Sequence, residues 1–313
     1  MRSIDAVVID RPIFLLGNQG DGLTLLSRII RRHPAVVSVT GGPAYWSGAC
    51  DLQNVMRPRL PASLALPLRA PAGTMLPSHL PMPHSWAYGC SETINHYRKT
   101  ALDSDLVTQR VLRRVIGESL WRHGRPRGSG RFLDGSQTFT VKVSFIDALL
   151  RDTQPHFVLV TRDPYATCLR AAAGAAGDMR RYARQLDFDR RLALCAEHWA
   201  GCMSAALADA EAAERFFIVP IEQFTAQPEA SLAGLLRFLG LHSVGDLLPA
   251  AHQTVPFGSR RADRWFPLRR DLNAPFLSSL QPHQAEIIHQ CCGELASRLG
   301  YERPQNDALR KPR

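Results

Sequence analysis

Short apolar runs alternate along this chain with stretches in which apolar residues recur at helical spacing. Residues 12–16 form the first apolar run, bounded by Pro and Gly, which is typical of a buried parallel strand. Residues 23–30 place apolar side chains on one helical face, and His33-Pro34 ends that helix. Residues 36–39 then form a second strand-like run. This order of strand, loop, helix and strand predicts the start of a nucleotide-binding fold.

The alternation continues to the end of the chain, interrupted at residues 57–83 by an irregular loop with seven prolines. Further strands are predicted at 131–134, 157–161 and 216–219, and a strand-like run at 139–141. Helices are predicted at 92–121, 165–173, 188–202, 228–239 and 287–299. We therefore expect an α/β fold with a central, mostly parallel sheet flanked by helices, in three layers. Such a sheet presents ligands at the carboxyl ends of its strands.

Composition changes this picture little. The 313 residues are 45% hydrophobic, which is enough for a large buried core. The net charge of +10 favours an anionic partner, but only three cations are lysine and no run of five cations occurs. We therefore expect dispersed arginines that bind small anions, and no nucleic-acid partner.

The cysteines favour a reduced, cytoplasmic chain. Their number is odd at seven, and they form neither a C-x-x-C pair nor a cluster with histidine that would suggest a metal. The first apolar run is too short for a signal peptide or a membrane span, so we expect neither. The oligomeric state is not readable from the sequence.

The loop between the first strand and the first helix is rich in glycine. A strand-to-helix loop directs main-chain N–H groups and the positive end of the helix dipole at a bound anion. The alternative is an ordinary glycine-rich turn. The candidate anion-binding residues are Gly17, Asn18, Gln19, Gly20, Asp21, Gly22, Leu23 and Thr24.

Two familiar nucleotide motifs do not fit this loop. Leu23-Thr24 follows Gly22 where a G-x-x-x-x-G-K-[ST] loop would have Lys and Ser or Thr, so ATP hydrolysis is disfavoured. The glycine spacing also differs from G-x-G-x-x-G.

Four segments in order resemble those of sulfotransferases that use 3′-phosphoadenosine 5′-phosphosulfate. The first runs from Pro12 through the loop to His33-Pro34 and is similar to the family's 5′-phosphosulfate segment. Residues 157–165 resemble its 3′-phosphate strand. Residues 222–228, with Glu-Gln-Phe, and 238–241, Phe-Leu-Gly-Leu, are similar to a third motif of the family. Residues 259–265 and the ending 299–301 resemble its C-terminal segment.

The resemblance implies a P-loop-like fold, a single domain over residues 1–313 and an insertion at about 43–130. It implies transfer of a sulfuryl group to a hydroxyl or amine of a small-molecule, lipid or carbohydrate acceptor. Arg162 is then expected at the 3′-phosphate, Arg170 stands where the family has a serine, and Arg260 and Arg261 are weaker phosphate ligands. The chain departs from the family at Gly20-Asp21, where Arg or Lys followed by Ser is usual, and at residues 134–137, where a second lysine is usual.

Sulfuryl transfer requires positioned cations and one base. Lys142 is a candidate to stabilise the leaving phosphate, with a solvated lysine at a helix start as the alternative. Asp21 and His84 are candidate bases, although capping N–H groups at the helix start is the commoner role for a residue placed as Asp21 is. His33 fits a helix terminator better than a base.

The remaining candidates also have structural alternatives. Arg162 fits either a ligand contact at the end of a strand or a surface turn with Asp163. Trp199 and Trp265 could stack on adenine, but Trp199 lies on an apolar stripe and suits the core. The rival to a sulfotransferase is a catalytically silent nucleotide-binding protein of the same fold, and a nucleotide-dependent kinase is a third reading.

Overall fold

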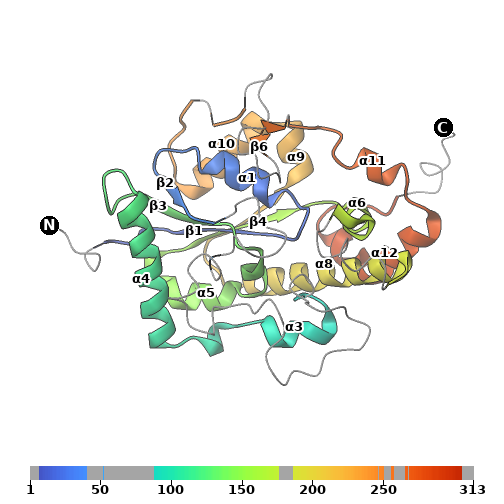
Figure 1. Cartoon of the computed structure of the whole chain (residues 1–313), viewed down its shortest axis with the longest axis horizontal. Helices are drawn as coiled ribbons and strands as arrows, with labels where there is room; N and C mark the ends of the chain where they lie inside the picture. Colours follow the sequence, from blue (N-terminus) through green and yellow to red (C-terminus); the bar gives the residue numbers. More distant parts are fainter. Residues whose placement is uncertain are drawn as a thin grey trace.

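A five-stranded parallel sheet forms the centre of the molecule (Figure 1). The computed structural model describes residues 7–40, 52, 88–175, 186–245, 247–249, 255–256, 265–266 and 268–304. The sheet consists of β1 (Ile13–Leu16), β2 (Val36–Ser38), β3 (Arg131–Asp134), β4 (His156–Thr161) and β5 (Phe216–Pro220). Their order is β2-β3-β1-β4-β5, and each neighbouring pair is parallel. The predicted α/β class and all five main strands are confirmed.

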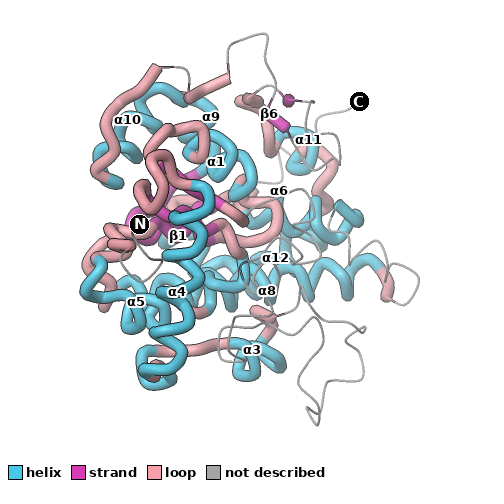
Figure 2. Tube along the Cα trace, turned by 60° about the vertical axis from the view of Figure 1, so that its left-hand side comes forward, coloured by secondary structure: helices cyan, strands magenta, loops and turns pink. Residues whose placement is uncertain are grey.

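Helices cover both faces of the sheet (Figures 1 and 2). One face carries α1 (Leu23–Ile30), α9 (Ile221–Ala226) and α10 (Pro228–Leu239). The other carries α4 (Leu106–His123), α5 (Val143–Leu150), α8 (Phe188–Ala210) and α12 (Pro282–Arg298). Shorter elements are α3 (Ser91–Tyr97), η4 (Ala101–Asp103), η5 (Gln137–Val141), η6 (Arg151–Thr153), α6 (Pro164–Arg170), η7 (Ala171–Ala175), α11 (Ala274–Leu277), β6 (Val255–Pro256) and β7 (Trp265–Phe266).

The side chains of β1 divide between two hydrophobic cores. Ile13 and Leu15 pack with α1 and α10, whereas Phe14 and Leu16 pack with α5 and α8. This division follows from the alternation of side chains along a strand. Since β1 is the central strand, both of its faces are buried, and its continuous apolar run reflects that position.

Two predicted elements were wrong in detail. Residues 139–141 belong to the 3₁₀ helix η5 and form no strand. They follow β3 too closely for the crossover that a parallel strand needs, and β3 already has β1 and β2 as neighbours. The helix predicted at 92–121 is divided, because Asp105 caps a new helix by accepting a hydrogen bond of 2.8 Å from the Thr108 N–H.

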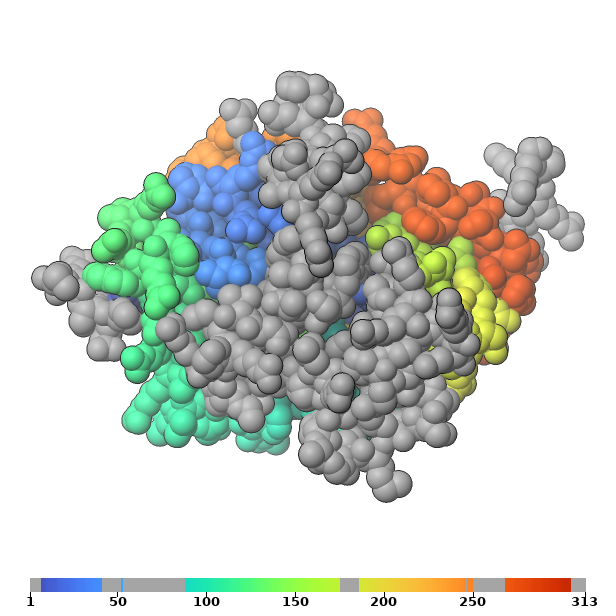
Figure 3. Space-filling model, viewed as in Figure 1, coloured from blue at the N-terminus to red at the C-terminus, as the bar shows by residue number. Residues whose placement is uncertain are grey.

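The first described segment lies centrally in the molecule. On the face shown in Figure 3, it is visible in blue between the green surface of α4 and the orange to red surface of the C-terminal elements. Within the described residues, no helix combines the length and the apolar character that crossing a membrane requires.

Candidate functional site

The predicted anion loop lies directly after β1, at the carboxyl edge of the sheet. The Gly17 N–H donates to Thr140 Oγ1 of η5 at 2.9 Å. The Asn18 side-chain amide donates to the Trp199 carbonyl of α8 at 3.3 Å. These two contacts fix the loop between elements that lie more than a hundred residues further along the chain. Among the described residues, the main-chain N–H groups of Gly20, Gly22 and Leu23 have no protein partner.

Asp21 folds back into this loop. Its Oδ2 accepts a hydrogen bond of 2.8 Å from the Asn18 N–H, and its side chain is fully buried. The N-cap of α1 is Gly22, without any side-chain cap, so the helix-cap interpretation of Asp21 is wrong. Burial raises the pKa of Asp21 to about 7, while the hydrogen bond from Asn18 and the charge of Arg162 offset part of that rise.

Arg162 lies against the same loop. Its Nη1 donates to the Gly20 carbonyl at 2.9 Å, which brings the carboxyl ends of β1 and β4 together as predicted. Its Nε donates to Asn273 Oδ1 and its Nη2 to the Leu272 carbonyl, each at 2.7 Å. The residue is 6% exposed, so the surface-turn interpretation is wrong. Three of the five N–H groups of a guanidinium are thus engaged by the protein.

Glu222 completes a polar network around Arg162 that the sequence did not predict. Its Oε1 accepts hydrogen bonds from the Asp163 N–H at 2.9 Å and from Asn273 Nδ2 at 2.6 Å. Its Oε2 accepts from the Tyr301 hydroxyl at 3.2 Å. Glu222 and Tyr301 lie in the segments that carry the family resemblance, and that resemblance was the available signal. Asn273 carried no signal.

Arg170 reaches the loop from α6. Its Nη1 lies 3.0 Å from the position that a Cβ on Gly20 would occupy, and Thr167 Cγ2 lies 3.5 Å from the same position. Thr167 and Arg170 are three residues apart and therefore share one face of α6. That face packs on the loop at Gly20. Arg170 is partly exposed, whereas Thr167 is buried.

Lys142 lies at the junction of η5 and α5. It is 1% exposed and occupies the N-cap position of α5, so it is a helix-start lysine but not a solvated one. The same short helix η5 supplies Thr140, which binds the loop at Gly17. A buried lysine next to the element that holds the loop suits the predicted role near a leaving phosphate.

Several buried polar atoms around the loop have no well-formed hydrogen bond within the described part of the chain. Buried polar atoms in proteins nearly always have partners, so such a group indicates where a polar ligand or water binds. The loop, η5 and α8 all contribute, and the Thr167 hydroxyl lies beside the Asp21 carboxyl. The atoms are Asn18 Oδ1, Asp21 Oδ1, Gln137 Nε2, Thr138 Oγ1 and Trp199 Nε1.

Other candidates are structural or fall outside the described residues. His33 ends α1, where its Nδ1 accepts from the Ala35 N–H and its Nε2 contacts the His242 carbonyl at 3.0 Å. Trp199 is 1% exposed and belongs to the core, as the apolar stripe indicated. A candidate base, two predicted phosphate ligands and one indole side chain lie outside the described residues: His84, Arg260, Arg261 and the side chain of Trp265.

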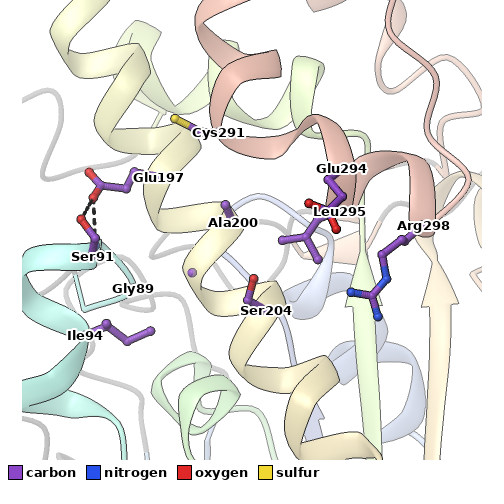
Figure 4. A pocket seen from close by; sticks show the side chains of 11 residues that line it. Gly89, Ser91, Ile94, Glu197, Ala200, Ser204, Cys291, Glu294, Leu295 and Arg298 are labelled. Atoms are coloured by element: carbon purple, nitrogen blue, oxygen red, sulfur yellow. Dashed lines mark hydrogen bonds between the residues drawn. The ribbon is translucent and has the colours of Figure 1, made fainter.

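A separate pocket of about 430 Å³ lies between α3, α8 and α12 (Figure 4). Glu197, Glu294 and Arg298 line it, and Glu197 accepts hydrogen bonds from the main-chain N–H and the hydroxyl of Ser91. Strands of the sheet lie behind these helices in Figure 4. None of the predicted ligand residues lines this pocket. Among the described residues, no group of His, Cys, Asp or Glu could hold a metal ion.

Comparison with known proteins agrees with this architecture. A family model described as "Sulfotransferase family" matches residues 12–245. The sulfotransferase domain of the olefin synthase from Synechococcus PCC 7002 is similar in structure, with a TM-score of 0.55 and 17% identity over 96% of this chain and 98% of that chain. Sulfotransferase STF9 from Mycobacterium avium gives a TM-score of 0.53 and 13% identity over 96% and 79% of the two chains. At these identities the likeness is one of fold. No curated protein matches the sequence.

Proposed function

This chain belongs to the sulfotransferase family, and we propose that it transfers a sulfuryl group from 3′-phosphoadenosine 5′-phosphosulfate to a hydroxyl or amine. The acceptor class that we propose is a small molecule, lipid or carbohydrate. The observation that carries the proposal is the contact between the loop after β1 and Arg162 after β4. A nucleotide with phosphates at both its 3′ and 5′ positions needs two anion sites close together, and this contact brings two candidates together.

The proposed 5′-phosphosulfate site is the loop of residues 17–24. The main-chain N–H groups of Gly20, Gly22 and Leu23 donate to no atom of the described residues, and the N-terminus of α1 adds its dipole. The Thr24 hydroxyl is a further donor in this proposal. The buried, unpartnered atoms of Asn18 and Gln137 are consistent with a polar ligand at this place.

The remaining roles concern charge. The sulfuryl donor supplies a good leaving group, the 5′-phosphate of the bisphosphorylated nucleotide. We assign Lys142 to the negative charge that develops on that phosphate. We assign Arg162 to the 3′-phosphate and Arg170 to the 5′ side. Arg260 and Arg261 are proposed as further phosphate ligands. Asp21 is held by the Asn18 N–H inside the loop, which favours a role in loop structure over one as base. His84 remains the other proposed base.

Calorimetric titration with adenosine 3′,5′-bisphosphate tests the nucleotide site. We expect saturable binding that ATP with Mg²⁺ does not match, and at least tenfold weaker binding by Arg162→Ala. A preference for ATP with Mg²⁺ would instead support a kinase. Absence of binding by the wild-type chain would contradict the proposal.

One observation favours the second candidate function, a catalytically silent nucleotide-binding protein. The loop itself contains no lysine or arginine, and it carries the buried carboxyl of Asp21 instead. Turnover separates the two functions. Radiolabelled sulfate that passes from the donor to any acceptor in a cell extract, and fails to pass with Lys142→Met, would identify an enzyme.

A further inference from the structure

The space beside Gly20 is occupied by a guanidinium from another element. A Cβ on Gly20 would meet Arg170 Nη1 at 3.0 Å, which is tighter than ordinary van der Waals contact. Gly20 also has a φ of +100°, a left-handed conformation that side chains rarely adopt. Both features disfavour a side chain at position 20, and Arg170 occupies that space.

The loop needs a cation from elsewhere. Residues 17–24 contain one carboxylic acid and no basic side chain. Arg162 is close, but three of its five N–H groups donate to the Gly20 carbonyl, the Leu272 carbonyl and Asn273, which leaves two for the 3′-phosphate proposed above. Arg170, among the described residues, lies next to the loop at Gly20, and its partial exposure leaves it within reach of a ligand from solvent.

We propose that Arg170 supplies the positive charge of the anion loop from α6, with its guanidinium in the space that a side chain at position 20 would fill. This inference rests on the proposed nucleotide-binding function. It adds that Arg170 takes the place of the basic side chain that position 20 lacks. The ligand group concerned is the doubly charged 5′-phosphate or phosphosulfate. The planar guanidinium can donate two parallel hydrogen bonds to such a group.

The position of Arg170 on α6 supports this assignment. α6 begins with Pro164, and Asp163 caps it by accepting from the Tyr165 N–H at 2.8 Å. The helix start is thereby tied to the end of β4, two residues after Thr161. One turn of helix separates Thr167 from Arg170, and both contact the same glycine. Because α6 starts directly after β4, the edge of the sheet sets the position of Arg170 relative to the loop.

The test uses the full chain and adenosine 3′,5′-bisphosphate as the probe, titrated at about 50 and 250 mM salt. We expect Arg170→Gln to weaken binding by roughly 10- to 100-fold and to reduce its salt dependence. Arg170→Lys should lie between the wild type and Arg170→Gln, since it keeps the charge but loses the fork. Arg190→Gln, at an exposed arginine on α8, is the control for a general loss of charge.

A double-mutant cycle tests the shared space. Gly20→Ala should weaken binding about two- to fivefold more in the wild type than in Arg170→Ala, because the new Cβ displaces the guanidinium only where Arg170 is present. Strain at the positive φ is common to both backgrounds and cancels in the cycle. If the effects of Gly20→Ala and Arg170→Ala on binding were additive, the claim that Arg170 occupies the space beside Gly20 would be wrong. Unchanged affinity and salt dependence in Arg170→Gln would overturn the inference while leaving the proposed function intact, whereas no binding by the wild type would overturn both.

Discussion

Asp21 is an acid in the loop that we propose binds an anion. Its carboxyl is fully buried, and among the described residues it forms no ion pair with a lysine or arginine. Burial without a paired cation is the reason that its pKa rises to about 7. At neutral pH the group is therefore divided between its neutral and ionised forms, and its charge becomes part of the energetics of the loop.

The raised pKa of Asp21 predicts a pH-dependent cost to stability. The unfolded pKa is about 3.9, so the neutral form contributes stability that is complete below about pH 4 and is lost as the pH rises through 7. Asp21→Asn cannot ionise at this position. The difference in the free energy of unfolding between this variant and the wild type should therefore shift in favour of the variant, by on the order of 1–4 kcal/mol, when the pH is raised from 4.5 to 8. Urea denaturation at both pH values measures this gain. Asp152→Asn, at an exposed carboxylate, is the control, and an equal gain in that variant would contradict the prediction.

Gly22 meets both a steric and a conformational limit. Its φ is +98°, and a Cβ there would lie 2.6 Å from Ile221 Cγ1. Gly22→Ala should lower the free energy of unfolding by about 2–4 kcal/mol, from the positive φ and from overpacking against the core. Gly234→Ala is the matched control, because Gly234 lies within α10 with no atom within 4 Å of a new Cβ. That control should stabilise the chain by about 0.5–1 kcal/mol, and a similar loss in both variants would contradict the steric argument.

The pattern of residues predicted the ends of the site better than its connections. Glycines between a strand and a helix, and an arginine that ends an apolar strand, are local signals, so the sequence predicted the positions of Gly17 and Arg162 directly after β1 and β4. Asn273 contacts Arg162 across 111 positions and follows no strand of the sheet. Such a contact depends on how the C-terminal segment returns to the sheet, and local spacing does not encode that return.

At the scale of elements, α3 and α8 approach each other through two glycines. A Cβ on Gly201 of α8 would lie 1.9 Å from the carbonyl oxygen of Gly89. Gly89 lies two residues before the start of α3. The Gly89 N–H also donates to His198 Nδ1 at 3.1 Å, so the two segments are joined by a hydrogen bond as well as by close packing. This contact positions the wall of the pocket that contains Ser91 and Glu197.

Gly201→Ala should therefore separate α3 from α8. We expect a loss of about 1–3 kcal/mol in the free energy of unfolding, since the backbone at Gly89 must move to admit the methyl group. Ser204→Ala, one turn further along α8 on the same pocket face, should change it by less than about 0.5 kcal/mol. Chemical denaturation of both variants gives the comparison. If Gly201→Ala were as stable as the wild type, the glycine contact would not hold α3 in place.

Elements with their own periodicity were predicted well, and elements defined by neighbours were not. α10 carries both signals, Pro228 at its start and Gly240 at its end, and both lie where they were expected. The apolar residues 139–141 suggested a strand, but the edges of β3 were already taken. Whether residues 139–141 can join the sheet depends on the order of its strands. The sequence pattern predicts which segments are strands but not that order.

At the scale of the whole molecule, one polar network joins distant parts of the chain to the anion loop. Arg162 contacts the loop at Gly20 and the segment before α11 at Asn273. Glu222, at the start of α9, binds Asn273 and the Tyr301 hydroxyl, and that hydroxyl lies 2.9 Å from Thr161 Oγ1. The sheet edge, α9 and the C-terminal segment are thus coupled through a few side chains. This network thus links the loop of residues 17–24 to residues as far along the chain as Tyr301.

Arg162 and Asn273 allow bracing to be separated from ligand binding. Arg162→Ala removes three hydrogen bonds and leaves the Gly20 and Leu272 carbonyls without this donor, so unfolding should become easier by about 2–4 kcal/mol. Asn273→Ala removes its bonds to Arg162 and Glu222 but keeps the guanidinium at the loop, and we expect a loss of about 1–2 kcal/mol. Thermal denaturation with and without adenosine 3′,5′-bisphosphate then separates the two roles.

Ligand binding to the folded state alone raises stability by about 2.7 kcal/mol when its concentration is 100 times the Kd. The wild type and Asn273→Ala should both show that rise at one ligand concentration, because the charge of Arg162 remains in place. Arg162→Ala, which binds at least tenfold more weakly, should show at most about half of it. Equal ligand-induced shifts in all three proteins would mean that Arg162 only braces the fold, and that the 3′-phosphate is bound by other cations of the chain.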